Sequence, residues 1–466
     1  MKKIILLSSF VFISLNAQTL KSSLSEVLSS NPIILERLQN YKSTQKDIDL
    51  AQAAYYPSLD LKLGYGYENS EKRNQVNDTL NRKDEFNVYQ NSLTYAQNLF
   101  DGFSTTYQVK EQEYKNISAA YSYIEKVNNT SFDLVNTYLE VIKNQELLGT
   151  AKENVLIDKE IFVKVKKLYD AGLTTLSEVN KIESSLALAQ SNLVVQENTL
   201  TDSLYNLQRV LGKEILPSEM ERPVINTTLP DSREEAISFA YANNPSLLVS
   251  EFNIRLSQAT TQTKLAAYYP QLDIEISESM NNNLSAIEGN DDRFRAMAFL
   301  SFNIFRGFTD STSVQKSRTQ VFQEIENQNK LKRQVLEGLN LSWAANEKLR
   351  EQLVYLVKYK DFSFKTLTLY SKEYDLGRRS LLDLLSAQND FIKAKAQIIT
   401  TEYSLLYAKY RILDAMGLLV SSIMQDSQIA YSNVGLSSNF DENIEEELQE
   451  SEIKIREIQE DSNQTN

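Results

Sequence analysis

The sequence contains neither cysteine nor histidine among its 466 residues. This absence excludes cysteine nucleophiles, imidazole acid–base catalysis, haem and iron–sulfur ligation, and ordinary zinc sites. An enzyme built from this chain would have to use carboxylates, lysine, tyrosine or serine alone.

Glycine and proline are also scarce, with 12 and 7 residues, where average usage would give roughly 30 and 20. Chains this poor in helix-breaking residues are usually built from long helices. Beyond the N-terminus no apolar run approaches the length of about 20 residues that a membrane-spanning helix needs, which excludes a protein with several such helices. The formal charge of −13 argues against nucleic acid as a partner.

The two ends of the sequence have compositions of their own. Residues 1–17 join a basic start to an apolar stretch and end on Ala17. This pattern predicts a secretory signal peptide cleaved after Ala17, rather than a short buried strand, and therefore an exported protein. Residues 431–466 form an acidic tail, in which residues 441–461 hold ten acidic side chains against one lysine and one arginine. We expect this tail to be a solvated extension.

The body of the chain is an internal duplication. Asn31-Pro32 and residues 54–60 recur 213 positions later, as Asn244-Pro245 and residues 267–273. Three further motifs recur at an offset of 205: residues 99–103 at 304–308, 169–172 at 374–377, and 211–212 at 416–417. One deletion in the second copy reconciles the two offsets. We therefore divide the chain into repeat 1 (18–212), a connector (213–232) and repeat 2 (233–430).

Both repeats show the same order of predicted elements. A first helix is interrupted at the Asn-Pro pair, because the residue before proline disfavours helical backbone. Two strands with alternating apolar and polar residues follow, and then a long helix with near-heptad apolar spacing, a glycine turn and a shorter helix. In repeat 1 these elements are expected at 22–55, 59–67, 89–99, 104–168 and 178–211; in repeat 2 they are expected at 233–268, 272–277, 294–304, 309–373 and 383–416.

The predicted strands suit a membrane. Pro57–Tyr67 has the length of about 9–11 residues that a membrane β-strand needs, and the polar stretches 68–85 and 278–293 would be external loops. Aromatic pairs at the helix–strand junctions, such as Tyr55 and Tyr56, either form a girdle at the membrane interface or simply pack the junction. Four strands leave edges that lipid does not tolerate, so closure needs more chains. Two chains would give a filled barrel and three would give a pore.

The sequence resembles the TolC-type outer-membrane efflux protein family (outer-membrane factors). The resemblance rests on the duplicated Tyr-Pro-x-Leu-Asp strand start, the Phe-x-Gly-Phe helix start and the paired Tyr-Asp-x-Gly turns, and it covers residues 20–420. It implies a mainly α fold with β: a long antiparallel, coiled-coil-like α-helical tunnel, and a transmembrane β-barrel to which each chain of a homotrimer contributes four strands. The implied location is the outer membrane of a Gram-negative bacterium, with an extension into the periplasm.

The resemblance also implies a function and its partners. The family forms the passive exit duct of tripartite efflux pumps or type I secretion systems, so we expect neither an enzyme nor a cofactor. The implied partners are a periplasmic adaptor (membrane fusion protein), an inner-membrane transporter of the RND, ABC or a similar type, and outer-membrane lipid.

The family's functional residues fall on the two glycine turns. Its gate at the periplasmic entrance corresponds to Tyr374 and Arg379, with Ser177 and Glu178 as their acceptors, so that an arginine–carboxylate link would act as a latch. Asp383 would line a cation-attracting ring, whereas the family's second acidic position carries Ser386, so a double ring is not expected. The implied adaptor contacts are Ala171, Gly172, Leu173, Leu376, Gly377 and Arg378. An ordinary helical hairpin would present the same residue types, as a glycine cap and solvated polar side chains.

Two other classes explain less of the sequence. An exported coiled-coil scaffold would not need alternating apolar strands with duplicated junctions. A secreted glycosidase would need a pair of acids, and no pair stands out from the helix surface charge. Outer-membrane fractionation and heat-modifiable oligomer migration would separate these classes from a duct.

Overall fold

A computed structural model describes residues 18–73, 81–225, 227–284, 289–426 and 431–434. The proposed signal peptide and the acidic tail beyond residue 434 lie outside the described residues. The described chain divides into two compact units, and both repeats contribute to each. The first unit draws on the spans Met1–Leu38, Ser122–Leu247 and Leu331–Asn466, and the second on Gln39–Tyr121 and Leu248–Lys330.

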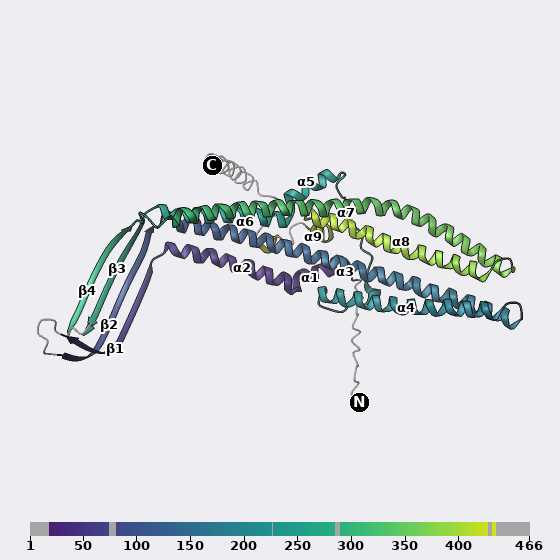
Figure 1. The fold of residues 1–466 in the computed structure, drawn as a ribbon, viewed down its shortest axis with the longest axis horizontal. Coiled ribbons are helices and arrows are strands. Elements are labelled where there is room, and N and C mark those ends of the chain that lie inside the picture. Colours follow the sequence, from purple (N-terminus) through teal and green to yellow (C-terminus); the bar gives the residue numbers. More distant parts are fainter. Residues whose placement is uncertain (1–17, 74–80, 226, 285–288, 427–430, 435–466) are drawn as a thin grey trace, which may run out of the picture. The chain divides into compact units, whose positions relative to one another are not determined.

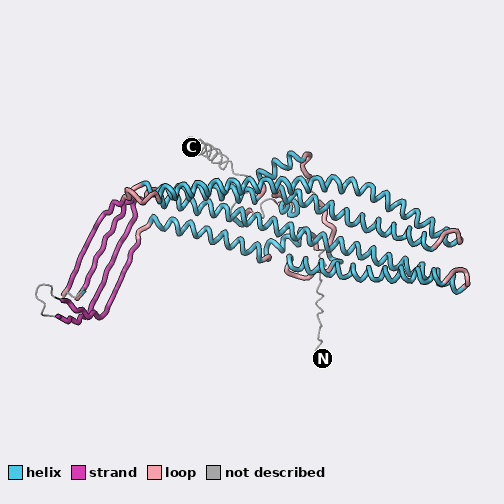
Figure 2. The backbone as a smooth tube through the Cα atoms, viewed as in Figure 1, coloured by secondary structure: helices cyan, strands magenta, loops and turns pink. Residues whose placement is uncertain are grey.

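The second unit contains one antiparallel β-sheet with the order β1-β2-β3-β4, drawn in magenta in Figure 2. Its strands are β1 (Ser58–Arg73), β2 (Asn81–Phe100), β3 (Gln271–Asn282) and β4 (Asn290–Ser301). The β2–β3 ladder joins the two repeats. Within the described residues β1 and β4 pair on one side only, so each presents an open edge.

The strands extend further than the alternation of side chains predicts. Pairing continues from Glu68 opposite Phe86 to Arg73 opposite Asn81, so the predicted loop at 68–85 is wrong for most of its length. Strands β3 and β4 likewise pair as far as Asn282 opposite Asn290, inside the second predicted loop. The prediction stopped where the side chains became polar, whereas strand pairing uses backbone groups that polar residues also possess.

One apolar face of the sheet is not covered by any other part of the described chain. Alternate residues of β1 are 62–70 % exposed: Leu59, Leu61, Leu63, Tyr65 and Tyr67. Contiguous apolar surface of this kind usually marks a contact with lipid or with another protein.

The helices follow the predicted order. They are α1 (Leu20–Ser30), α2 (Pro32–Gln52), α3 (Ser104–Asp170), α4 (Leu176–Leu211), α5 (Arg233–Asn243), α6 (Pro245–Leu265), α7 (Thr309–Asp375), α8 (Leu381–Ala415) and α9 (Leu419–Met424). Short 3-10 turns occupy Ala53–Tyr55, Pro217–Glu219, Ala266–Tyr268 and Ser432–Val434. Helices α3 and α7 have 67 residues each, or about 100 Å at 1.5 Å per residue. In the described part of the chain, no helix is both long enough and apolar enough to cross a membrane.

The predicted breaks at the Asn-Pro pairs are confirmed, and the asparagine side chains explain them. The Asn31 side chain accepts a hydrogen bond from the backbone N–H of Ile33 at 3.0 Å, and its Nδ2 donates to the carbonyl oxygen of Val210 at 2.9 Å. In repeat 2, Asn244 Nδ2 donates to the carbonyl oxygen of Ala415, also at 2.9 Å. Each asparagine therefore bonds a carbonyl in the last turn of α4 or α8, where no further intrahelical donor is available.

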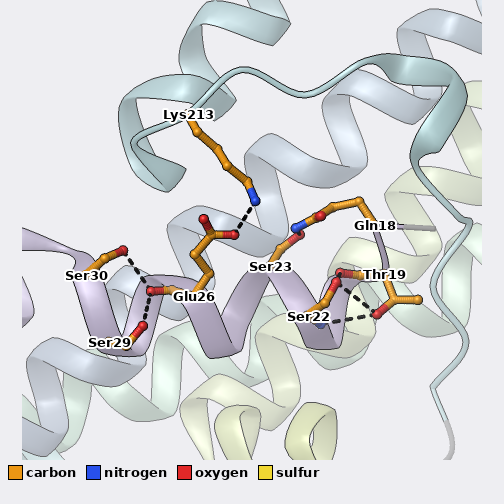
Figure 3. A network of polar contacts seen from close by, with 8 residues as sticks. All are labelled: Gln18, Thr19, Ser22, Ser23, Glu26, Ser29, Ser30 and Lys213. Carbon is orange, nitrogen blue, oxygen red and sulfur yellow. Dashed lines mark hydrogen bonds and ion pairs between the residues drawn. The ribbon is translucent and has the colours of Figure 1, made fainter. Parts of the chain in front are cut away.

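The start of α1 is fixed by a cap and an ion pair (Figure 3). The hydroxyl of Thr19 accepts a hydrogen bond from the backbone N–H of Ser22 at 3.1 Å, as an N-cap residue does. Further along the helix, Glu26 Oε2 lies 2.6 Å from Lys213 Nζ. This pair ties the first helix of repeat 1 to the segment that follows α4.

Candidate functional site

The α3–α4 hairpin ends in a glycine turn of defined geometry. The backbone N–H of Gly172 donates to the carbonyl of Tyr169, and that of Leu173 donates to the carbonyl of Leu168, both at 2.8 Å. This pair of bonds is a Schellman motif, which needs a left-handed residue after the helix. Gly172 supplies it with φ of +72°.

The α7–α8 hairpin repeats this construction. The N–H of Gly377 donates to the carbonyl of Tyr374, and that of Arg378 donates to the carbonyl of Glu373, both at 2.9 Å. Gly377 has φ of +69°. The two turns lie at the same end of the first unit (Figure 1).

All six residues expected to contact an adaptor are exposed: Ala171, Gly172, Leu173, Leu376, Gly377 and Arg378. Each turn carries one strongly exposed leucine beside its glycine, Leu173 at 75 % and Leu376 at 69 %. The two turns therefore offer similar apolar tips to a partner.

Tyr374 links one hairpin to the other. Its hydroxyl donates to Glu178 Oε2 at 3.4 Å, and the Thr174 hydroxyl donates to the same oxygen at 2.5 Å. Burial, and then the charge of Glu178, raise the pKa of Tyr374 to about 12. Tyr374 therefore remains a neutral donor near neutral pH. The structure thus brings together two of the predicted gate residues.

Arg379 contacts its own hairpin instead of the other one. Its Nε donates to Glu373 Oε2 at 2.8 Å, and its guanidinium lies 4.2 Å from the ring centroid of Tyr370. Within the described residues it makes neither of the expected contacts, to Ser177 or to Glu178. The glycine turn reverses the chain between Glu373 and Arg379, which brings a carboxylate of the same hairpin within reach.

A second link between the hairpins joins Lys164 Nζ on α3 to Asp375 Oδ1 on α7, at 2.6 Å. Both side chains are partly exposed, and a pair of this kind contributes at most about 1 kcal/mol. This link could not be predicted from the sequence. Asp375 belongs to a repeated motif, but nothing in the local spacing identifies Lys164 as its partner.

The other predicted site residues lie at the start of α4 and α8. Ser177 and Ser386 are exposed, and Asp383 is half-buried. The Ser380 hydroxyl accepts from the N–H of Asp383 at 3.1 Å and donates to Asp383 Oδ2 at 2.8 Å. Asp383 therefore completes a cap on α8, where a negative charge is favourable. Its carboxylate also remains accessible to solvent ions.

An apolar cluster next to the turns gives the two hairpins a shared core. Its buried members are Ile161, Val165, Val179, Ile182, Tyr374, Leu381, Leu384 and Leu385. They come from α3, α4, α7 and α8, so movement of one hairpin against the other must disturb this cluster. No group of three or more histidine, cysteine or acidic side chains that could hold a metal ion occurs among the described residues.

Known proteins match this architecture along most of the chain. The family described as "Outer membrane efflux protein" matches residues 23–213 and 236–418. Outer membrane efflux protein BepC of Brucella suis biovar 1 is 20 % identical over 406 residues, which cover 86 % of each protein. Proteases secretion protein PrtF of Dickeya chrysanthemi is 22 % identical over 384 residues, covering 78 % of this chain and 80 % of the relative.

The fold also matches solved structures. The CmeC outer membrane channel of Campylobacter jejuni superimposes with a TM-score of 0.75 at 14 % identity, covering 91 % of this chain and 90 % of that structure. The family match extends over both repeats and most of the sequence, and it shows that this chain belongs to the outer membrane efflux protein family.

Proposed function

We propose that three copies of this chain form one duct, in which three four-stranded sheets close a barrel of twelve strands and the helices line a tunnel below it. The observation that carries this proposal is the sheet with two open edges and an uncovered apolar face. An open edge is unstable in lipid, and pairing β1 of one copy with β4 of the next would remove every edge.

The chain is an outer-membrane channel with a periplasmic extension, and it serves efflux or secretion rather than catalysis. The names of its relatives point to both uses, since BepC is an outer membrane efflux protein and PrtF a proteases secretion protein. For this chain, the partners we infer are a periplasmic adaptor and an inner-membrane transporter.

The tips of the two hairpins are the proposed adaptor contacts. Leu173 and Leu376 are exposed beside rigid glycine turns, so they present apolar side chains at fixed positions. Burying such a side chain at an interface contributes about 1.5–3 kcal/mol. Two tips in each of three copies would give a ring of six contacts.

We infer that contacts between the two hairpins hold the entrance closed. The Tyr374–Glu178 hydrogen bond and the Lys164–Asp375 ion pair join the first hairpin to the second. Arg379 braces the second turn through Glu373. Three copies of Asp383 around the axis would attract cations to the entrance.

Site-specific cross-linking would test the adaptor contacts. Because the chain has no cysteine, Leu173→Cys and Leu376→Cys each introduce a single thiol at a tip. We expect a thiol-anchored photo-cross-linker at either position to capture the periplasmic adaptor, identified by mass spectrometry. Leu188→Cys is the matched control, because Leu188 is also exposed but lies on α4 away from the turn. Equal capture from all three positions would contradict the assignment of the tips.

A further inference from the structure

A buried polar layer crosses the shared core of the two hairpins. Asp158 on α3 and Gln388 on α8 are each only 1 % exposed. Gln388 Nε2 donates to Asp158 Oδ1 at 2.7 Å and to Asn154 Oδ1 at 3.0 Å. Ser185 Oγ, on α4, donates to Asp158 Oδ2 at 3.1 Å. The carboxylate of Asp158 therefore holds α4 and α8 against α3.

This carboxylate has no cation beside it in the described part of the chain. Burial raises the pKa of Asp158, and the hydrogen bonds from Gln388 and Ser185 oppose that rise. Gln388 Oε1 is also buried and has no hydrogen-bond partner among the described residues. An ionised carboxylate that is buried without a counter-charge is costly.

The neutral form of Asp158 fits the same geometry without losing a bond. A proton on Oδ2 would be donated to Ser185 Oγ, whose own hydrogen is free to rotate because Ser185 is only half-buried. Gln388 Nε2 would still donate to Oδ1. Protonation therefore removes a buried charge and keeps all the contacts between the helices.

We propose that Asp158, Gln388 and Ser185 form a proton-sensitive clasp, a set of positioning residues that holds the two hairpins together and favours a closed entrance when Asp158 is protonated. The clasp lies away from the turns and is separate from the gate residues, although its effect on conductance rests on the proposed duct function. Parting of the hairpins would admit water to the layer and return Asp158 to its ordinary acidity.

The pKa of Asp158 differs between the closed and the parted hairpins, and this difference sets the direction of the pH effect. Because burial between the hairpins raises the pKa of Asp158, the contribution of Asp158 to the closed form is complete below the ordinary aspartate value of about 4. The contribution is lost as the pH rises through the raised value. Acidification therefore closes the entrance and alkalinisation loosens it.

The neighbouring charged groups do not take over this role. The two side chains bonded to Asp158, Ser185 of α4 and Gln388 of α8, do not titrate near neutral pH. On the same helices Glu153 pairs with Lys395, and Asp390 of α8 accepts a hydrogen bond from Tyr359 of α7 at 3.1 Å.

Planar-bilayer conductance of the purified full-length oligomer, measured from pH 4 to pH 8, would test the clasp. We expect the wild-type conductance to rise severalfold as the pH increases above the ordinary aspartate value of about 4. Asp158→Asn mimics the neutral form, so its conductance should stay low and flat. Glu160→Gln also removes one negative charge, but at an exposed position of α3. It should therefore keep the wild-type dependence of conductance on pH.

A second variant covers the case in which Asp158→Asn does not assemble. Ser185→Ala removes one donor to the ionised carboxylate at a half-buried position. We expect the midpoint of the conductance change to move to higher pH, because hydrogen bonds to charged groups are the stronger ones.

A wild-type profile in an assembled Asp158→Asn oligomer, or an unmoved midpoint in Ser185→Ala, would overturn the clasp and leave the duct intact. Absence of any conductance in the wild type would instead overturn the duct, and the clasp with it.

Discussion

Replacing Gly417 with alanine is expected to destabilise the first unit more than the same change at Gly212. Gly417 follows α8 and Gly212 follows α4, the corresponding helices of the two repeats, and both glycines have left-handed backbones, with φ of +73° and +84°. Their surroundings differ. A Cβ at Gly417 would lie 2.7 Å from the carbonyl oxygen of Asn243 and 3.3 Å from Cδ of Pro245, whereas a Cβ at Gly212 would meet nothing within 4 Å.

The expected magnitudes follow from these two contributions. A left-handed backbone costs an alanine about 1–2 kcal/mol at either position. Close contact with backbone atoms at Gly417 adds about 1–3 kcal/mol, the usual cost of overpacking. We therefore expect Gly417→Ala to lose roughly 2–5 kcal/mol and Gly212→Ala roughly 1–2 kcal/mol.

The chain contains a fluorescent residue that can report the unfolding of both variants. Its one tryptophan, Trp343, packs against a buried cluster that includes Met416, the residue before Gly417. Unfolding in guanidinium chloride, followed by tryptophan fluorescence at one protein concentration in detergent, would compare the two variants with the wild type. Losses that agree within about 0.5 kcal/mol, the usual limit of additivity, would refute the close contact at Gly417.

Three further predictions concern the hairpin turns. Arg379→Ser should raise the conductance in planar bilayers, because it removes the ion pair with Glu373; unchanged conductance with an intact oligomer would remove Arg379 from the gate. Asp383→Asn should weaken block by multivalent cations, and unaltered block would place the acidic ring elsewhere. Tyr374→Phe should raise conductance by removing the bond to Glu178. Burial, and then the charge of Glu178, raise the pKa of Tyr374 to about 12, so the contribution of this contact to closure is complete below the ordinary tyrosine value of about 10 and is lost as the pH rises through the raised value. This contact would be contradicted if the wild type opened between pH 8 and pH 9 and Tyr374→Phe removed that pH dependence.

Most of the fold could be predicted from the sequence, because duplicated residues with special backbone requirements mark its turns and helix breaks. The repeated Gly172 and Gly377 place both hairpin turns, and α3 and α7 end at Asp170 and Asp375, two residues beyond the ends predicted at 168 and 373. The strand ends were harder to predict. Residues 68–73 continue the β1 ladder with polar side chains that give no apolar alternation.

The side-chain partners could not be predicted from spacing. Lys164 and Asp375 are 211 positions apart, and Asp158 and Gln388 are 230 apart. In the sequence each resembles an ordinary polar residue on a helix surface. Only the packing of one hairpin against the other shows that the first pair forms a surface ion pair and the second lies in the core. The family resemblance places Arg379 next to the second turn, and there its Nε donates to a carboxylate of the same hairpin, Glu373.

The central claim is that a single chain supplies only part of a closed wall. Native mass spectrometry of the detergent-extracted protein, purified from outer membranes, would test it most directly. The account predicts a particle containing three copies of the mature chain. A stable single-chain species, recovered in the aqueous fraction without detergent, would contradict it.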